Sequence, residues 1–366
     1  MMHILKRYLN KKYIVGLCAL LCLCTACRSD TDYIRDVDYS KLRYVIADNY
    51  NLSTFNAALE VTAYNELLAG EGPFTVLIPS NTAFLNAGLG ANNIRLRSGA
   101  QNAALLNYHI LEGRYALNQM PFLFNQEVQT RLGVPIYVTH WVQEGDTVLT
   151  INGSRMFVQD LQASNGVGQV IDQVLEPNVF EDVLDVISSR KDLTLFAQAI
   201  QRSGLSHLFR SAKSCTVFAP DNEAMNALGY SSIDAINVAD PQVLGDMVRY
   251  HLMESRRFVN DFDLSMRYTQ EGTYALDFYD AAMEEVVTAN GRGSKRGSLN
   301  ARMQDTHQVR LVYSKGQITV GQQNVDAYRM SIFDETNTET IVSPRYKNLV
   351  AKNGCVHLID RVLRRL

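Results

Sequence analysis

The chain has 366 residues, with 35 Lys and Arg against 38 Asp and Glu, which gives a formal net charge of −3. Four of the basic residues and none of the acidic residues stand in the first 26 positions, so the remainder carries 31 basic against 38 acidic residues, a net charge of −7. An acidic chain of this kind lacks the positive surface that nucleic-acid binding requires, and its remaining length, about 340 residues, suits two domains of ordinary size.

The N-terminal segment has the layout of a secretion signal. Four basic residues precede an apolar stretch over residues 14–24, which is too short to span a bilayer as a mature helix. Small residues then lead to Cys27, a pattern that resembles a bacterial lipoprotein signal, in which cleavage before the cysteine is followed by its lipidation. The sequence therefore predicts a signal peptide over residues 1–26, a lipid on Cys27 and membrane attachment through that lipid alone. The alternative is an ordinary signal peptide cut near Ala26, with the cysteine incidental.

The segment behind this cysteine predicts where the protein resides. Residues 27–39 are polar and show no apolar period, so we expect them to tether the first domain to the lipid. Asp30 and Asp32 resemble the acidic signals that direct lipoproteins of the Bacteroides group to the cell surface, and a plain solvated linker is the alternative. We therefore expect a lipid-anchored protein of the outer membrane, exposed at the cell surface, with the periplasmic face as the alternative.

Beyond the tether, the apolar pattern is first helical and then strand-like. Two stripes have helical spacing: Leu52, Phe55, Ala58 and Leu59, then Tyr64, Leu67 and Leu68. A short apolar strand over residues 75–78 ends at a proline, after which Ser80 can cap the next helix. Later segments over residues 136–139 and 147–150 are β-rich, and residues 152–153 read Asn-Gly, which predicts a turn. Helices first and strands afterwards predict an α+β fold.

Three phrases of this pattern occur twice in the same order. They are PFTVLIPSNTAF at 73–84 and SCTVFAPDNEAM at 214–225, NYHIL at 107–111 and RYHLM at 249–253, and SNGVGQVIDQVL at 164–175 and KNGCVHLIDRVL at 352–363. Ordered repeats of this kind indicate two copies of one domain. In the second copy, Asp221 takes the place of the capping Ser80.

The repeated phrases resemble the three signature segments of the fasciclin-like domain. The resemblance covers residues 40–177 (copy one) and 180–366 (copy two), and copy two matches best. It implies two tandem domains, each a β-sheet wedge flanked by helices. It also implies an extracellular or cell-envelope protein that works in adhesion and binding rather than catalysis. Copy one departs from the family pattern at Gln169, where copy two has His357.

Histidines in the repeated phrases are the first candidates for chemistry. His109 and His251 each follow a tyrosine inside an apolar segment. They are either ligand contacts or general bases, or core histidines whose ring nitrogens bond to the backbone, and we favour the core interpretation. His357 joins them as a structural residue of the family motif. Because no metalloprotease helix, phosphate-binding glycine loop or nucleophile elbow is present in the sequence, we expect no catalytic residue, no metal and no cofactor.

Two cysteines remain in the domains. Cys215 stands at the first strand of copy two and Cys355 in its closing strand, and in the family these strands lie close together. Export to an oxidising compartment allows a disulfide between them, which would close a loop of about 140 residues. Two buried, unpaired thiols are the alternative.

Copy two is longer than copy one. Its second and third phrases are about 46 residues further apart, and this excess lies between residues 260 and 350. The insertion contains glycines and cations over residues 291–298, including Arg292, Lys295 and Arg296, which predict an exposed flexible loop that binds a partner. It also contains the aromatic residues Tyr313, Tyr328, Phe333 and Tyr346. A surface elaboration without a partner is the alternative.

One short pattern suggests a modification. Asp146-Thr147-Val148 resembles the O-glycosylation signal of Bacteroides-group proteins and stands beside Gly145 in a predicted turn. Thr147 is therefore a candidate for glycosylation, and an unmodified threonine at the start of a strand is the alternative.

These features together predict a lipid-anchored envelope protein that binds a protein or a glycan at the cell surface and catalyses no reaction. One alternative is an accessory lipoprotein that docks on an outer-membrane importer of glycans or peptides. A less favoured alternative is an enzyme that acts on a surface polymer. Nucleic acid is not an expected partner.

Overall fold

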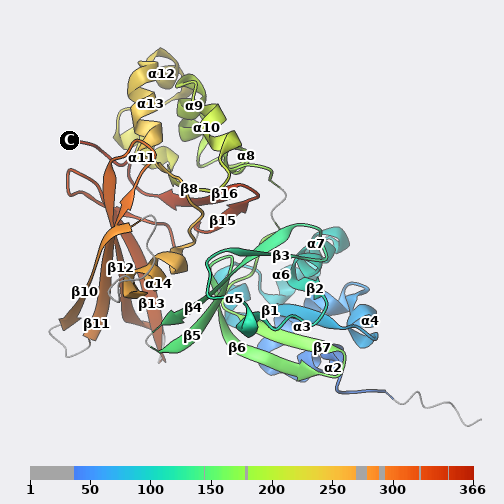
Figure 1. The fold of residues 1–366 in the computed structure, drawn as a ribbon. Helices are drawn as coiled ribbons and strands as arrows, with labels where there is room; N and C mark the ends of the chain where they lie inside the picture. Colours follow the sequence, from blue (N-terminus) through green and yellow to red (C-terminus); the bar gives the residue numbers. More distant parts are fainter. Residues whose placement is uncertain are drawn as a thin grey trace, which may run out of the picture. The chain divides into compact units, whose positions relative to one another are not determined.

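The computed structural model describes residues 37–143, 145–177, 180–268, 278–287, 293–320, 323–344 and 346–366 (Figure 1). Ser40–Leu366 form one compact unit, distinct from the unit Met1–Tyr39. The predicted signal peptide, Cys27, tether residues 27–36 and Arg292 lie outside the described residues.

The helices of copy one bury the predicted apolar stripes. They are α2 (Leu42–Ala47), α3 (Ser53–Glu60), α4 (Tyr64–Ala69), α5 (Asn81–Asn86), α6 (Ala91–Leu96) and α7 (Gly99–His109), with short 3-10 turns η1 (Tyr50–Leu52) and η2 (Leu117–Gln119). Leu52, Phe55 and Leu59 are no more than 1% exposed. Ser80 caps α5 as predicted, because its hydroxyl accepts a hydrogen bond from the Ala83 N–H at 3.1 Å.

The strands of copy one form a seven-stranded sheet in the order β2-β1-β7-β6-β5-β4-β3. They are β1 (Phe74–Pro79), β2 (Ile110–Glu112), β3 (Gln126–Gln129), β4 (Pro135–Gln143), β5 (Asp146–Ile151), β6 (Ser154–Ala163) and β7 (Gly166–Ile171). The closing strand β7 runs parallel to β1, with Phe74 opposite Gly166, and the other pairs are antiparallel. The first and third repeated phrases therefore lie side by side.

Both faces of β1 are buried, each in a different core. Val76 and Ile78 pack with the helices, whereas Leu77 packs in a second core that holds side chains of β4 and β5. Successive side chains of a strand point to opposite faces of a sheet. The far strands therefore cover the face of β1 that the helices leave open, and this gives the sheet its wedge form.

The helices of copy two follow the same plan. They are α8 (Val183–Ser188), α9 (Thr194–Arg202), α10 (Ser206–Ser211), α11 (Asn222–Ala227), α12 (Ile233–Val238), α13 (Pro241–Arg249) and α14 (Val259–Tyr268). Asp221 caps α11 as predicted, because its carboxylate accepts a hydrogen bond from the Ala224 N–H at 2.8 Å.

The strands of copy two form two sheets where copy one has one. The four-stranded sheet, in the order β15-β16-β8-β9, contains β8 (Cys215–Pro220), β9 (Leu252–Met253), β15 (Leu349–Ala351) and β16 (Gly354–Ile359). The five-stranded sheet runs in chain order through β10 (Phe278–Val287), β11 (Gly293–Arg302), β12 (Gln308–Val320), β13 (Gln323–Phe333) and β14 (Glu339–Ile341). As in copy one, the closing strand is parallel to the first, with Gly354 opposite Cys215. The predicted α+β fold with two tandem copies is confirmed.

The insertion forms a sheet, and the predicted flexible loop over residues 291–298 is wrong for residues 293–298. These residues lie in β11, which pairs with β10 on one side and β12 on the other. In backbone register, Lys295 lies opposite Glu285 and Lys315, and Arg296 is its neighbour on the strand. Glycines and cations have a low propensity for strands, so the sequence alone does not predict one here. The strand forms because β10 and β12 pair with it on both sides.

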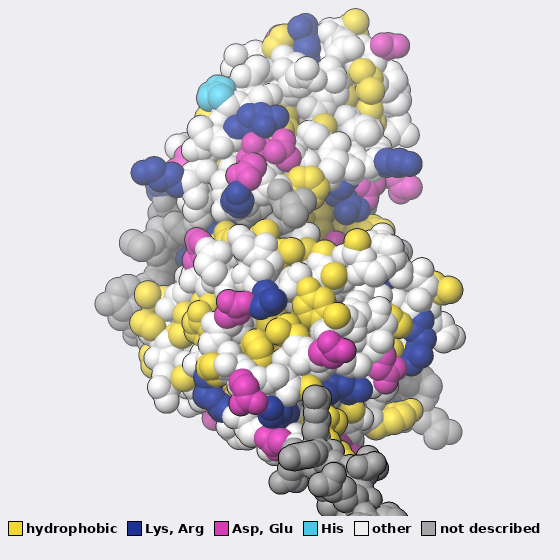
Figure 2. All heavy atoms as spheres, turned by 90° about the vertical axis from the view of Figure 1, so that its right-hand side faces the viewer, with side chains coloured by type: hydrophobic (Ala, Val, Ile, Leu, Met, Phe, Trp, Pro, Cys, Tyr) yellow, Lys and Arg dark blue, Asp and Glu magenta, His cyan; other side chains and the backbone are white. Residues whose placement is uncertain are grey.

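The surface carries charges of both signs. On the face shown in Figure 2, Lys and Arg side chains alternate with Asp and Glu, and no broad field of one sign covers it. None of the helices in the described residues is both long enough and apolar enough to cross a membrane.

Candidate functional site

His109 and His251 are buried and are bonded in the same way at both ring nitrogens. Nδ1 of each donates to the carbonyl oxygen four residues earlier, at 2.8 Å and 2.7 Å. Nε2 accepts from the N–H of Leu175 at 3.1 Å in copy one and of Leu363 at 3.0 Å in copy two. Burial lowers the pKa of both histidines to about 4, so they are neutral at pH 7. With both nitrogens occupied, neither ring can serve a substrate, and the geometry agrees with the core interpretation.

His357 and Gln169 occupy matching places in the closing strands. His357 accepts from the Asn348 N–H at 3.0 Å and donates to the Arg257 carbonyl at 2.9 Å, and burial lowers its pKa to about 4. Gln169 instead exchanges two hydrogen bonds with Asp160, at 3.0 Å and 2.9 Å. Each side chain ties the closing strand to a neighbouring segment, so the departure of copy one from the family pattern replaces one structural bond with another.

Cys215 and Cys355 are both buried and both free, so the predicted disulfide is not formed. In the parallel pairing of β8 and β16, Cys215 lies opposite Gly354, whereas Cys355 lies opposite Thr216. Because neighbouring residues of a strand face opposite ways, the two thiols point to opposite faces of the sheet. The Cys215 side chain packs in the helical core and the Cys355 side chain packs with Tyr137 and other residues of a separate cluster.

Thr147 lies where an enzyme could reach it. It is exposed and follows Asp146 at the start of β5, just after the turn that joins β4 to β5. Glycosylation of Thr147 stays a prediction, and intact-mass analysis of the native protein would show whether sugar is attached.

The two copies are joined by polar side chains that are buried where α14 begins. Asp261 accepts hydrogen bonds from the Thr139 hydroxyl at 3.0 Å and the Asn125 amide at 3.2 Å, both in copy one. It also accepts from the Phe258 N–H at 2.9 Å. Burial raises the pKa of Asp261, while the charge of Arg257 and the three hydrogen bonds favour the ionised form. We call the contacts between the two copies, of which those of Asp261 are the first part, the domain interface.

A cation and an aromatic ring form the second part of the domain interface. The guanidinium of Arg256 lies 3.5 Å from the centre of the Tyr137 ring of copy one. The same guanidinium donates to the Ala351 carbonyl at 3.1 Å, and the Tyr137 hydroxyl donates to the Lys352 carbonyl at 3.2 Å. The Asn125 amide donates to the Arg256 carbonyl at 2.8 Å. Both copies thus contribute donors and acceptors, which fixes their relative orientation.

The predicted Asn-Gly turn of copy one is the third part of the domain interface. The Asn260 amide donates to the Gly153 carbonyl at 2.6 Å. Gly153 has φ +74°, and a Cβ at this position would lie 2.6 Å from Cβ of Phe258. Beside the turn, Arg155 forms an ion pair of 2.8 Å with Asp263. Only glycine fits here, because any other residue would be strained at this positive φ and its Cβ would clash with copy two.

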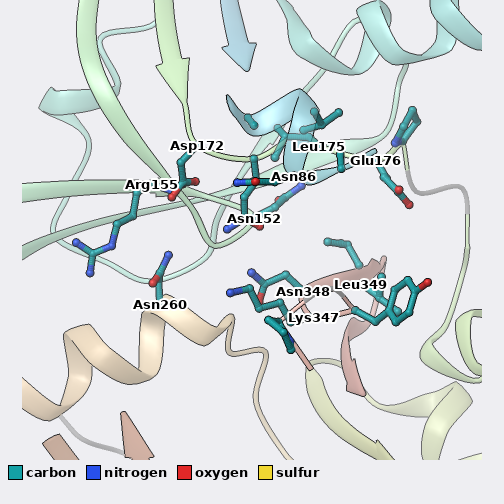
Figure 3. Close-up of a pocket in the computed structure, with 18 of the residues that line it drawn as sticks. Asn86, Asn152, Arg155, Asp172, Leu175, Glu176, Asn260, Lys347, Asn348 and Leu349 are labelled. Carbon is teal, nitrogen blue, oxygen red and sulfur yellow. The ribbon is translucent and has the colours of Figure 1, made fainter. Parts of the chain in front are cut away.

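A cleft of about 1270 Å³ opens beside the domain interface (Figure 3). Asn86, Asp172 and Glu176 of copy one lie on one side, and Lys347 and Leu349 of copy two lie on the other. Partner binding by Lys295 and Arg296 of the insertion stays a prediction.

Asp172 and Lys347 are two half-buried charges on opposite walls of this cleft. Asp172 Oδ1 accepts from the Ser154 hydroxyl at 2.7 Å and the Arg155 N–H at 2.8 Å. Burial raises the pKa of Asp172 and lowers that of Lys347, and the charge of each opposes the shift of the other. No described residue forms an ion pair with Lys347, so its ammonium group is available to a ligand. Sequence reasoning missed this pair, because the two residues are far apart in the chain.

Metal chemistry has no support among these groups. No cluster of three His, Cys, Asp or Glu side chains in the described part of the chain is placed to hold a metal ion.

Known proteins resemble this chain in both copies. The sequence model of the fasciclin domain matches residues 50–177 and 191–365. The transforming growth factor-beta-induced protein ig-h3 of Oryctolagus cuniculus is 27% identical over 191 residues, which are 51% of this chain and 27% of that protein. Periostin of Homo sapiens is 27% identical over 220 residues, 58% of this chain and 24% of that protein. The chain thus spans about a quarter of the length of these two relatives.

A bacterial relative and a solved structure complete the comparison. Protein sll1483 of Synechocystis sp. is 34% identical over 135 residues, 36% of this chain and 71% of that protein. The solved structure is a FAS1 domain pair from the insect cell adhesion molecule fasciclin I, with 17% identity and a TM-score of 0.35 over 86% of this chain and 96% of that chain. Since the family pattern covers most of both copies, the chain belongs to the fasciclin domain family and carries two such domains in tandem.

Proposed function

We propose that this protein is a lipid-anchored adhesion protein of the cell envelope that binds a protein or glycan partner and catalyses no reaction. The proposal rests on which polar side chains are already hydrogen-bonded within the protein and which remain available to a ligand. The buried histidines of the repeated motifs bond to backbone groups or lie in the core, while a cleft beside the domain interface keeps polar side chains that no described residue engages. Such an arrangement suits recognition better than chemistry.

The family supports an adhesion role. Fasciclin I, whose domain pair this chain resembles, is a cell adhesion molecule. The ig-h3 protein and periostin are much longer than the part of them that aligns here, so the partner of this chain follows from its own surface rather than from theirs.

The anchor and the location are the other half of the proposal. Cys27 would carry the lipid, and residues 27–39 would hold the domains away from an outer membrane, at the cell surface. Acyl chains at one terminus are enough to keep a protein at a membrane surface.

The experiment compares the wild-type chain with Cys27→Ser in cells fed a clickable fatty acid. The wild type should take up the label, sediment with outer membranes and be cleaved by protease added to intact cells. The Cys27→Ser protein should remain unlabelled and leave the membrane fraction. Labelling that survives the substitution contradicts the anchor, and protection from external protease places the protein on the periplasmic face.

Adhesion itself is tested with the same cells. Cells that display the wild-type protein should adhere to immobilised host or bacterial surface material more than cells that release the Cys27→Ser form. Equal adhesion would contradict the adhesion role. Stoichiometric copurification of the wild type with a large barrel protein would instead favour the importer alternative.

A further inference from the structure

We propose that the cleft between the two copies is a binding site for an oligosaccharide with neutral rings; the inference rests on the proposed adhesion function and specifies its ligand. The cleft measures about 1270 Å³. Pockets for single drug-sized ligands occupy roughly 300–1,000 Å³. There is room here for more than one sugar ring.

The first argument is which charges of the cleft are already engaged. Arg155 is paired with Asp263 at 2.8 Å. Arg190 is paired with Asp192 through two hydrogen bonds of 2.9 Å and 2.6 Å. In each of these ion pairs the two charges neutralise each other, so the pairs form part of the wall of the cleft and do not attract a charged ligand.

The second argument concerns the polar side chains of the cleft that remain available to a ligand. The lining side chains whose polar groups no described residue engages are Thr82, Asn86, Gln173, Glu176, Lys191 and Lys347. The second oxygen of Asp172 adds a further acceptor. The cleft thus offers two cations from copy two, and two anions and two amides from copy one. A polyanion or a polycation would meet like charge on such a surface, whereas a hydroxyl group, which both donates and accepts, can use every one of these groups.

Aromatic rings at the cleft add an apolar face. Phe157, on strand β6, is 66% exposed although it is a large apolar side chain. Tyr346 also lines the cleft, and the guanidinium of Arg190 lies 4.3 Å from the centre of its ring. The C–H face of a sugar ring can pack on the exposed Phe157 ring, whose face is electron-rich, while its hydroxyls reach the polar groups.

A peptide strand is a poorer fit. The strand of copy two that lines the cleft is β15, at the edge of its sheet, and an edge can accept an added strand. Here two main-chain groups at one end of this edge are already engaged. The Ala351 carbonyl accepts from Arg256, and the Lys352 N–H, just beyond the strand, donates to the Phe180 carbonyl at 3.1 Å. A peptide backbone would find these two groups occupied.

The site needs both copies. Asn86, Asp172 and Glu176 come from copy one, and Lys191 and Lys347 come from copy two, on opposite sides of the open space in Figure 3 where they are labelled. The domain interface holds the two sides at a fixed separation, so little ordering is needed when a ligand enters.

The test uses the full chain, purified in detergent, on an array of neutral and anionic oligosaccharides, followed by titration with the best neutral binder. Lys347→Gln removes a facing ammonium, and Ala87→Trp fills the cleft from an exposed alanine on its wall. Lys213→Gln and Ala100→Trp are the matched controls, since both residues are exposed and neither lines the cleft. Loss of a hydrogen bond to a charged group should weaken binding by about tenfold or more.

We expect neutral oligosaccharides to bind the wild type and both controls, and to bind the two cleft variants at least about tenfold more weakly. Retention of glycan binding by Ala87→Trp would overturn the assignment to the cleft and leave the adhesion function standing. Binding only to anionic glycans or to peptides would overturn the ligand class. Failure to bind any oligosaccharide, with cell adhesion intact, would overturn the inference alone, whereas loss of adhesion as well would overturn the proposed function.

Discussion

The two copies repeat their buried hydrogen bonds more faithfully than their sheets. Asn165 accepts from the N–H of Leu42 at 2.8 Å and donates to the Leu68 carbonyl at 2.8 Å. Its counterpart Asn353 accepts from the N–H of Val183 at 2.9 Å and donates to a helix-end carbonyl at 2.7 Å. The repeated phrases therefore encode a polar framework that ties the helices to the closing strand, and this framework persists although one copy has a single sheet and the other has two.

What differs between the copies produces the surface between them. Copy two contributes α14 from its longer central region, and copy one contributes the turn and strands that α14 contacts. Shared residues thus build the framework and unshared residues build the domain interface, while the cleft uses both, since Asp172 belongs to the third repeated phrase. Each prediction below tests one side of that division.

The largest expected effect is a loss of stability in acid that differs between the copies. Copy one has one buried neutral histidine of the repeated motifs, His109, and copy two has two, His251 and His357. Their folded pKa of about 4 lies below the unfolded value of 6.5, so the unfolded chain binds more protons as the pH falls from 6.5 to 4. Each histidine should therefore cost about 2 kcal/mol at pH 5, and copy two should lose about twice as much as copy one.

Hydrogen exchange of the two closing strands at pH 7 and pH 5 would measure this difference. Three carboxyls whose pKa is raised by burial act in the opposite direction: Asp172 in copy one, and Asp261 and Asp305 in copy two. The decisive comparison therefore uses a variant that leaves these carboxyls unchanged. His357→Gln introduces the residue that copy one carries at Gln169, and it should make copy two less sensitive to acid by about 2 kcal/mol. An unchanged pH dependence in this variant would exclude His357 as the cause.

The next effect tests the shared framework. Asn165→Ala and Asn353→Ala should each destabilise the host copy by about 3 kcal/mol, because each leaves backbone donors and acceptors buried without partners. Equal losses in the two copies, measured by denaturant unfolding, would support a common framework. A loss confined to one copy would show that the two asparagines are equivalent in sequence but not in energy.

A glycine pair separates the domain interface from backbone strain. Gly153 and Gly133 have φ of +74° and +79°, but a Cβ on Gly133 would meet nothing within 4 Å. Gly133→Ala should therefore cost only the strain of an unfavourable φ, whereas Gly153→Ala should cost about 2 kcal/mol more, because copy two stands in the way. Similar melting temperatures for the two variants would contradict the tight interface.

The smallest effect concerns the thiols. Burial raises the pKa of Cys215 to about 12 and that of Cys355 to about 11, so neither should react with a thiol reagent at pH 8 in the folded protein. After denaturation without reductant, both should react. If neither thiol of the mature protein reacts in denaturant, Cys215 and Cys355 form a disulfide, and the pairing of β8 and β16 described above is contradicted.

The sequence predicted the framework better than the interface. The repeated phrases predicted the tandem copies, the first and closing strands and the caps Ser80 and Asp221, because each depends on residues close in the chain. The strand over residues 293–298 was missed because its partners supply the order that its glycines and cations lack. Asn125 and Asp261 gave no signal either, since a polar residue buried against a distant one looks like any surface residue until the fold brings them together.

The parallel pairing of first and last strands also sets how each copy folds. Phe74 must meet Gly166 across 92 positions of chain, and Cys215 must meet Gly354 across 139. The entropy lost in closing a loop grows only with the logarithm of its length, so the longer insertion adds well under about 1 kcal/mol to that cost. Both copies nevertheless have a high contact order, because the sheet around the first strand is incomplete until the closing strand arrives. Each copy is therefore expected to fold slowly and cooperatively, with copy one free to finish before copy two.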